Sequence, residues 1–216
     1  ARRAAARAAP GGGAAFDGIR HRLQRAQGLL GQRLPLLLLQ LLRGAHDLVA
    51  PVLAARALSE ALEGETAEAR ILDAGCGTGL VGAEIARRTE AEIDGIDLSP
   101  GMLEEAARKK VYRSLAEADM TATLNLSDNS YDGVVSVGVF TSGHVGPEAI
   151  DELARVARPG APLVVTVHEK VWEPDRYAAH LAEMERHGLI RLRAINDAPY
   201  HEKEGYTCKL CLLEAA

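Results

Sequence analysis

The chain has 216 residues, enough to bury one substantial core, so we expect one enzyme-sized domain and an additional segment. Its 47% apolar and 25% charged residues are typical of a globular protein. The net charge of −5 argues against nucleic-acid binding, which needs a basic face, and favours a small-molecule partner.

The first 44 residues differ from the rest in charge. They contain eight arginines and one acid, Asp17, which gives +7 and leaves −12 for the remainder. This Ala- and Arg-rich composition resembles an organelle transit peptide, although it lacks serine, and a disordered or helical basic tail or an inaccurate gene start explains it equally well. We therefore predict an N-terminal extension over residues 1–44 and one domain over residues 45–216.

The most apolar stretch is Leu34–Leu42. It is shorter than the roughly 20 residues that span a bilayer, so we expect helix packing and no membrane anchor or secretion signal. The three cysteines are an odd number without a disulfide pattern, which favours a reduced compartment. We expect the cytoplasm, or an organelle if residues 1–44 are a transit peptide.

Hydrophobic periodicity predicts alternating strands and helices after the extension. Ser99 precedes Pro100 in the arrangement of a helix cap and first helical position. The expected helices cover 45–62, 80–89, 100–109, 147–157 and 175–187, and the expected strands cover 70–75, 91–97, 112–118, 131–138, 161–167, 189–195 and 206–213. This order predicts a Rossmann-like α/β fold: a seven-stranded, mostly parallel sheet with an antiparallel last strand and helices on both faces.

Cys208 and Cys211 fall in the last expected strand. Positions three apart on a strand point to opposite faces, so we expect two structural cysteines and no metal site.

The turn after the first strand, Asp73-Ala74-Gly75-Cys76-Gly77-Thr78-Gly79, is the strongest candidate ligand site. Its glycines permit a sharp turn and close approach of a ligand at a helix N-terminus. Gly77, Gly79 and Gly82 also match the dinucleotide fingerprint, a weak signal by itself. Asp73 argues against a dinucleotide, because an acid at the strand end would repel a pyrophosphate. The same acid suits a ligand with a cationic group.

Two further acids follow expected strands. Asp97 lies about 20 residues beyond the glycine turn. A carboxylate in this position can accept hydrogen bonds from both ribose hydroxyls of a nucleotide or nucleoside cofactor. Asp119 ends the next strand and is either an adenine contact or a turn residue.

Five segments in order, 72–79, 95–103, 118–120, 131–134 and 158–160, resemble the signature motifs of class I S-adenosylmethionine-dependent methyltransferases. The resemblance implies that the glycines line the methionyl end, Asp97 binds the ribose, and Asp119 and Met120 flank the adenine. The expected cofactor-binding residues are Asp73, Gly75, Cys76, Gly77, Gly79, Asp97, Leu98, Met102, Asp119, Met120, Ser136 and Gly138.

The segment 137–147 is similar to the methyltransferase-like protein 27 family and its bacterial relatives. Family members usually carry a Tyr- and Asp-rich lid before the first strand, whereas this chain has Ala-His-Asp-Leu-Val-Ala-Pro at 45–51. A catalytically inert methyltransferase-like binding domain is therefore an alternative.

Methyl transfer from a sulfonium is an in-line displacement in which alignment supplies most of the acceleration, so a base is optional. We predict His144 as the candidate base, because it follows the fourth strand at the carboxyl edge of the sheet, and His168 as the second. Both are also explained as loop or capping histidines. Tyr200, His201 and Tyr206 either overhang an acceptor pocket or belong to a solvated loop.

Two other enzyme classes remain. An NAD(P)-dependent oxidoreductase fits the glycines and Asp97, but Asp73 and the paired last strands oppose it. A methyltransferase that acts on protein or nucleic acid is a further alternative, but methylation of base amino groups is unsupported, because no Asn-Pro-Pro-Tyr or similar segment follows the fourth strand. We expect a methyltransferase with a small-molecule acceptor; the sequence leaves the acceptor and the oligomeric state open.

Removal of residues 1–44 should leave cofactor affinity within about threefold, or roughly 0.6 kcal/mol, because the predicted site residues all follow residue 70. Calorimetric titration of S-adenosylhomocysteine into a chain starting at Ala45 measures this. Loss of binding would show that the extension belongs to the fold.

Overall fold

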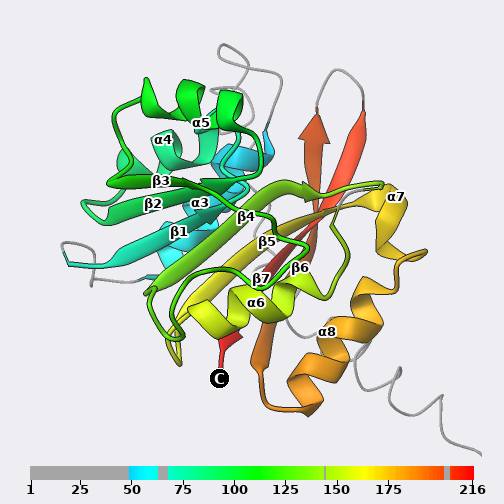
Figure 1. Ribbon diagram of the computed structural model, residues 1–216. Helices are drawn as coiled ribbons and strands as arrows, with labels where there is room; N and C mark the ends of the chain where they lie inside the picture. The colour runs from blue at the N-terminus through cyan, green and yellow to red at the C-terminus, as the bar shows by residue number, and fades with distance from the viewer. Residues whose placement is uncertain (1–48, 63–67, 144, 202–204) are drawn as a thin grey trace, which may run out of the picture. The chain divides into compact units, whose positions relative to one another are not determined.

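A seven-stranded sheet forms the centre of the chain, in the strand order β3-β2-β1-β4-β5-β7-β6 (Figure 1). The computed structural model describes residues 49–62, 68–143, 145–201 and 205–216. The strands are β1 (Arg70–Ala74), β2 (Glu92–Asp97), β3 (Ser114–Glu117), β4 (Gly133–Phe140), β5 (Pro162–His168), β6 (Ile190–His201) and β7 (Tyr206–Ala215). The predicted extension 1–44 lies outside the described residues.

Strands β1 to β5 are parallel, and β7 runs antiparallel to both of its neighbours, β5 and β6. The first five strands are separated by crossover segments, whereas β6 and β7 follow each other directly and must pair as a hairpin. The predicted Rossmann-like α/β class is confirmed.

Helices cover both faces of this sheet because apolar residues alternate along the strands. Ile71 packs beneath α3 (Ala50–Ala61) and α4 (Leu80–Ala86), whereas its neighbour Leu72 belongs to the core beneath α6 (Ala149–Val156) and α8 (Tyr177–Arg186). Helix α5 (Pro100–Ala107) packs on β2 and β3, and the short α7 (Glu169–Trp172) follows β5 (Figure 1).

The ends of the elements depart from the expected ranges where tertiary contacts decide them. The predicted helix 45–62 is observed over Ala50–Ala61, and its residues 45–48 lie outside the described residues. The third strand shortens to four residues at the sheet edge. Strand β6 continues to His201, well beyond the expected 195, because β7 pairs with it along almost its whole length. The predicted Ser99 cap is confirmed: its Oγ accepts a hydrogen bond from the Met102 amide at 3.4 Å.

The cysteines of β7 lie on opposite faces, as their spacing predicts. Cys211 packs in the core beneath α6 and α8, and Cys208 packs with the first turn of α3. Both thiols are buried, and burial raises the pKa of Cys208 to about 11, which agrees with a structural role.

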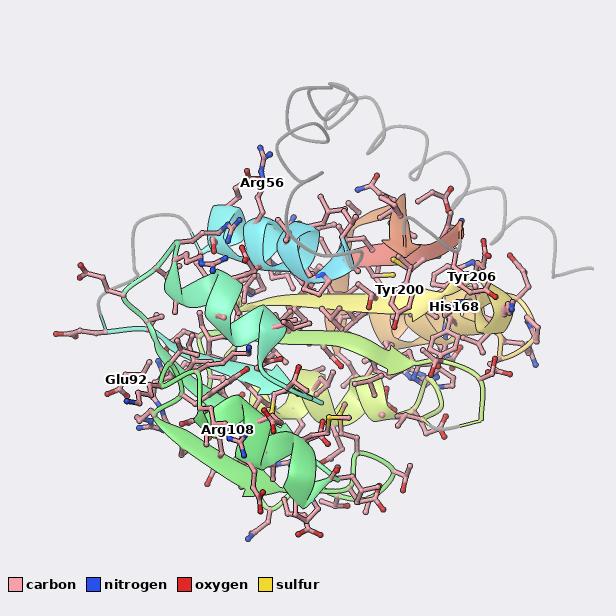
Figure 2. All side chains as sticks on the ribbon, turned by 90° about the horizontal axis from the view of Figure 1, so that it is seen from above. Arg56, Glu92, Arg108, His168, Tyr200 and Tyr206 are labelled. Carbon is pink, nitrogen blue, oxygen red and sulfur yellow. The ribbon has the colours of Figure 1, made fainter. Side chains whose placement is uncertain are left out.

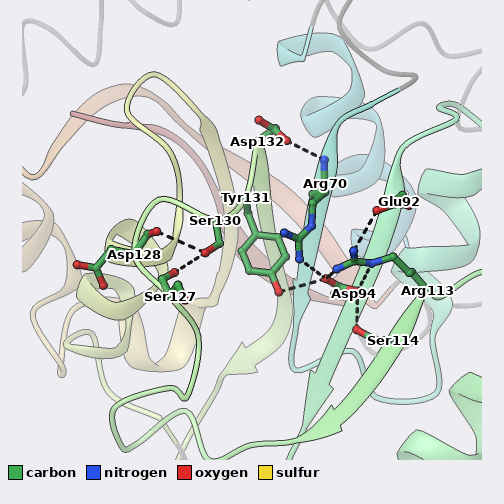
Figure 3. Close-up of polar contacts among 10 residues, drawn as sticks. All are labelled: Arg70, Glu92, Asp94, Arg113, Ser114, Ser127, Asp128, Ser130, Tyr131 and Asp132. Carbon is green, nitrogen blue, oxygen red and sulfur yellow. Dashed lines mark hydrogen bonds and ion pairs between the residues drawn. The ribbon is translucent and has the colours of Figure 1, made fainter.

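A buried acid anchors the amino-terminal half of β2. Figure 3 shows Asp94, 4% exposed, surrounded by donors from β1, from β3 and from the residues that flank β3 and β4. Its two oxygens accept hydrogen bonds from Arg113 Nε (3.0 Å), Ser114 Oγ (2.5 Å), Arg70 (3.2 Å) and the Tyr131 hydroxyl (3.3 Å). Burial opposes ionisation of Asp94, but these hydrogen bonds outweigh it and lower its pKa to about 2.

Replacement of Asp94 by Asn should cost about 2 kcal/mol of unfolding free energy at neutral pH. A lowered folded-state pKa gives stability that is present above the unfolded value near 4 and is lost as the pH falls toward 2. Urea denaturation of both proteins from pH 7 to pH 2 should therefore show the difference shrinking below about pH 4.

Glu105→Gln is the matched control, because Glu105 forms an exposed ion pair with Arg108. Such pairs contribute roughly 0 to 1 kcal/mol. A cost for Asp94→Asn that is the same at pH 7 and pH 2 would contradict the assigned charge effect.

Candidate functional site

The turn between β1 and α4 is shaped by three glycines in left-handed conformations. Gly75, Gly77 and Gly79 have φ values of +72°, +53° and +80°. A Cβ at Gly75 would lie 2.1 Å from Val139 Cγ2 of β4, whereas no described atom lies within 4 Å of the position a Cβ would take at Gly77. The backbone is therefore packed against β4 on one side and open at Gly77, where a ligand can approach it closely.

Asp73 lies directly beneath this turn. Its side chain is fully buried, and its Oδ2 accepts hydrogen bonds from the Tyr112 hydroxyl at 2.6 Å and the Gly82 amide at 3.1 Å. Its Oδ1 is buried and has no partner among the described residues. Burial raises the pKa of Asp73 to about 6 despite these hydrogen bonds, so a cationic group nearby would be stabilised by the ionised acid.

Tyr112 is a site residue that the sequence reasoning missed. Its ring occupies space left by three glycines: a Cβ would lie 2.9 Å from it at Gly79, 2.3 Å at Gly82 and 3.0 Å at Gly95. Burial raises the pKa of its hydroxyl, which therefore stays protonated and donates to Asp73. Gly95, inside strand β2, was the signal in the sequence that could have indicated such a residue. A glycine within a strand often marks a place where another group packs closely against the backbone.

Asp97 ends β2 beside the glycine turn. One carboxylate oxygen accepts the Gly77 amide and the other accepts the Ser99 amide, both at 2.9 Å. The acid thus fixes the open part of the turn and remains partly exposed. Next to it, Leu98 and Met102 are 61% and 45% exposed, so two large apolar side chains face solvent beside the carboxylate.

The acid after β3 has a different environment. Asp119 is exposed, and its Oδ1 accepts hydrogen bonds from the Thr121 amide (2.8 Å) and hydroxyl (2.7 Å), which lower the pKa of the carboxyl. Met120 is buried, and its sulfur lies 3.7 Å from the Cβ position of Gly75. The structure therefore brings Met120 to the glycine turn, and it engages Asp119 Oδ1 in a local turn with Thr121.

Strand β4 is irregular where it passes the site. Its register with β5 shifts between Ser136 and Phe140, and Gly138 (φ +80°) donates its amide to Thr166 Oγ1 at 3.1 Å. Bulges of this kind occur next to active sites, where they redirect a strand. Ser136 is fully buried, and its hydroxyl has no hydrogen-bond partner among the described residues.

The structure describes only one of the two histidines predicted as a candidate base. His144 lies outside the described residues and stays a prediction. His168 ends β5, and its Nδ1 accepts the Lys170 amide at 3.2 Å as the cap of α7. Its ring lies between Tyr200 and Tyr206 with centroid distances of 5.4 Å to each (Figure 2).

The chain is similar in sequence to known methyltransferases. Residues 71–160 match the family model described as a methyltransferase domain. Over 118 residues the chain is 39% identical to human methyltransferase-like protein 27, a match that covers 54% of this chain and 48% of that protein. Residues 71–160 are therefore similar to methyltransferase domains, and the predicted resemblance to methyltransferases is confirmed. The segment 137–147 had already indicated the methyltransferase-like group.

One further sequence relative and one solved structure of the same fold are also similar to this chain. Trans-aconitate 2-methyltransferase of Methylobacterium nodulans is 36% identical over 110 residues, covering 50% of this chain and 42% of that protein. Magnesium protoporphyrin IX methyltransferase of Synechocystis, solved with bound S-adenosylmethionine, aligns with a TM-score of 0.61 at 19% identity, covering 78% of this chain and 81% of that one. The chain spans less than half the length of the two curated relatives.

Within the described ranges, no helix of the methyltransferase domain is long and apolar enough to cross a membrane. The same ranges contain no cluster of three or more side chains suited to hold a metal ion.

Replacement of Tyr112 by Phe should cost about 1 to 2 kcal/mol of unfolding free energy above pH 6, where Asp73 is ionised and loses a donor. The cost should decrease below pH 6, because Asp73 then takes up a proton. The hydrogen bond that Phe removes is weaker when its acceptor is a neutral carboxyl group than when it is a carboxylate. Denaturant unfolding at pH 5 and pH 8 measures both values.

Tyr177→Phe provides the control, because the hydroxyl of Tyr177 donates to the Val145 carbonyl at 3.0 Å and not to a carboxylate. Its cost should be independent of pH over the same interval. A pH-independent cost for Tyr112→Phe would separate Tyr112 from the ionisation of Asp73.

Proposed function

We propose that this domain binds S-adenosylmethionine and catalyses methyl transfer to a small-molecule acceptor. The observation that carries the proposal is the buried Asp73 beneath the glycine turn, with one carboxylate oxygen unpartnered among the described residues. An acid in this place stabilises an ammonium or sulfonium group and disfavours the pyrophosphate of NAD(P). This favours methyl transfer over the oxidoreductase alternative.

The remaining residues of the turn fit the same cofactor. Gly77 leaves its backbone open to a ligand, and Asp97 beside it presents a partly exposed carboxylate suited to ribose hydroxyls. The exposed Leu98 and Met102 offer an apolar surface for a flat base such as adenine. We further propose that Gly75, Cys76, Gly79, Asp119, Met120, Ser136 and Gly138 complete the cofactor site.

When bound, the cofactor would supply a methyl group activated for in-line transfer to the acceptor atom, with the carbon–sulfur electron pair left on sulfur. The protein then needs to align the acceptor and exclude water. Here the packed side of the turn, where Gly75 touches Val139, and the bulge of β4 position the cofactor-facing backbone. We propose His144 as the base for acceptors that must lose a proton.

The relatives support a small-molecule acceptor, because one is named as a trans-aconitate methyltransferase and another as a magnesium protoporphyrin IX methyltransferase. The family supports an active enzyme over an inert binding domain, and turnover with a panel of small acceptors distinguishes the two.

Replacement of Asp97 by Ala should lower affinity for S-adenosylhomocysteine by about thirtyfold to a thousandfold, or roughly 2 to 4 kcal/mol. The loss combines two ribose hydrogen bonds with release of the Gly77 amide. Asp97→Asn, which keeps one carbonyl oxygen for that amide, should show a smaller loss. Isothermal titration of both variants gives the values.

Asp175→Ala is the control, because Asp175 is an exposed acid that follows α7. The titration should include NAD. Binding of NAD without S-adenosylhomocysteine by the unmutated protein would overturn the proposed function, and unchanged affinity in Asp97→Ala would remove Asp97 from the site.

A further inference from the structure

Three aromatic side chains gather at the carboxyl end of β5, outside the proposed cofactor residues. His168 is the last residue of β5, and Tyr200 and Tyr206 come from the two strands of the terminal hairpin (Figure 2). The Tyr200 ring stands edge-on to the His168 ring at 79°, and the Tyr206 ring is tilted by 59°. We call His168, Tyr200 and Tyr206 the aromatic cluster.

The pairing of the strands explains why these residues meet. His168 pairs with Cys208, which in turn pairs with Ala198 on β6. Tyr206 lies two residues from Cys208, so its side chain emerges on the same face of the sheet as His168. Tyr200 is the extra residue of the bulge between Pro199 and His201, and its ring packs against the His168 ring. Each of the three is half-buried, which leaves part of its ring accessible to a ligand.

This cluster borders the cofactor side of the domain. The Tyr200 hydroxyl lies 3.0 Å from the position a Cβ would take at Gly138, in the bulge of β4. The next residue, Val139, contacts Gly75 of the glycine turn. A molecule held against Tyr200 therefore borders the segment of β4 that packs on the glycine turn.

Charge on this face comes from Lys170, whose Nζ lies 4.4 Å from the centre of the Tyr206 ring. Two nearby acids are engaged on the opposite face: Glu169 accepts the Thr207 hydroxyl, and Asp197 pairs with Lys209. Thr207 and Lys209 alternate with Tyr206 and Cys208 along β7, so their side chains point away from the aromatic cluster. Lys170 is therefore the cation that lies against the rings of the cluster.

The hydrogen-bonding groups at the cluster are donors. His168 uses Nδ1 to accept the Lys170 amide, so its neutral ring carries the proton on Nε2. Burial raises the pKa of Tyr200, whose hydroxyl stays protonated at neutral pH. These two groups and the Lys170 ammonium match the oxygen atoms of a carboxylate, which accepts hydrogen bonds only.

We propose that His168, Lys170, Tyr200 and Tyr206 form the acceptor site and bind a small planar carboxylic acid, with the rings against its flat body and the donors at its carboxylate. The inference rests on the proposed methyltransferase function and names its acceptor class. A carboxylate is ionised at neutral pH, so such an acceptor needs no base to remove a proton before transfer.

The test compares trans-cinnamate with its neutral amide, cinnamamide, by calorimetric titration into the full chain saturated with S-adenosylhomocysteine. Cinnamate should bind about tenfold more tightly, and more so at low salt, because the amide lacks the charge that Lys170 recognises. Lys170→Met and Tyr200→Phe should each lower cinnamate affinity by about fivefold and leave cinnamamide within about twofold.

Lys110→Met is the control, because Lys110 is an exposed lysine beyond α5. Unchanged affinity of each variant for S-adenosylhomocysteine shows that it is folded. Failure of S-adenosylhomocysteine to bind the unmutated protein would remove the proposed function and the acceptor site with it. Binding of S-adenosylhomocysteine without a preference for cinnamate, or with the preference intact in Lys170→Met, would overturn the acceptor assignment alone.

Discussion

The hydrogen bond from Tyr112 to Asp73 is the contact on which the geometry of the site depends. It joins the segment before β3 to the end of β1, across a sheet position where Gly95 leaves room for the ring. The Gly82 amide reaches the same carboxylate oxygen, so one acid fixes the start of α4 relative to the sheet. An unpaired acid at this depth would be costly, and partial pairing holds it in place while one oxygen stays without a partner among the described residues.

Two buried acids of the same sheet illustrate how surroundings assign a role. Asp94 is enclosed by two arginines, a serine and a tyrosine, and its pKa falls to about 2, so it is a permanent charge that stabilises the fold. Asp73 receives only neutral donors, and burial raises its pKa to about 6. The difference follows from the partners, since strongly perturbed acids that lack a structural cation are candidates for ligand binding.

Local patterns in the sequence predicted the parallel half of the fold, because the glycine turn and the alternating strands depend on residues close in the chain. They did not predict Tyr112, whose role depends on Gly79, Gly82 and Gly95 in other elements. They also ended β6 too early, since Pro199 and Tyr200 read as a loop until β7 pairs with them. Contacts between distant segments, which a single sequence does not show, decided both cases.

The proposed cofactor site and the proposed acceptor site differ in the same way in how far the sequence predicts them. The residues proposed for the cofactor come from the ends of β1 and β2, from α5, from the segment after β3 and from β4, and most of them fall in short contiguous groups that leave motifs in the sequence. The proposed acceptor residues come from β5 and from a hairpin more than 30 residues further along, where pairing with β7 brings Tyr200 and Tyr206 to His168. Among the described residues, Tyr200 approaches the bulge of β4 at Gly138, so the two proposed sites border each other there while their residues come from different elements.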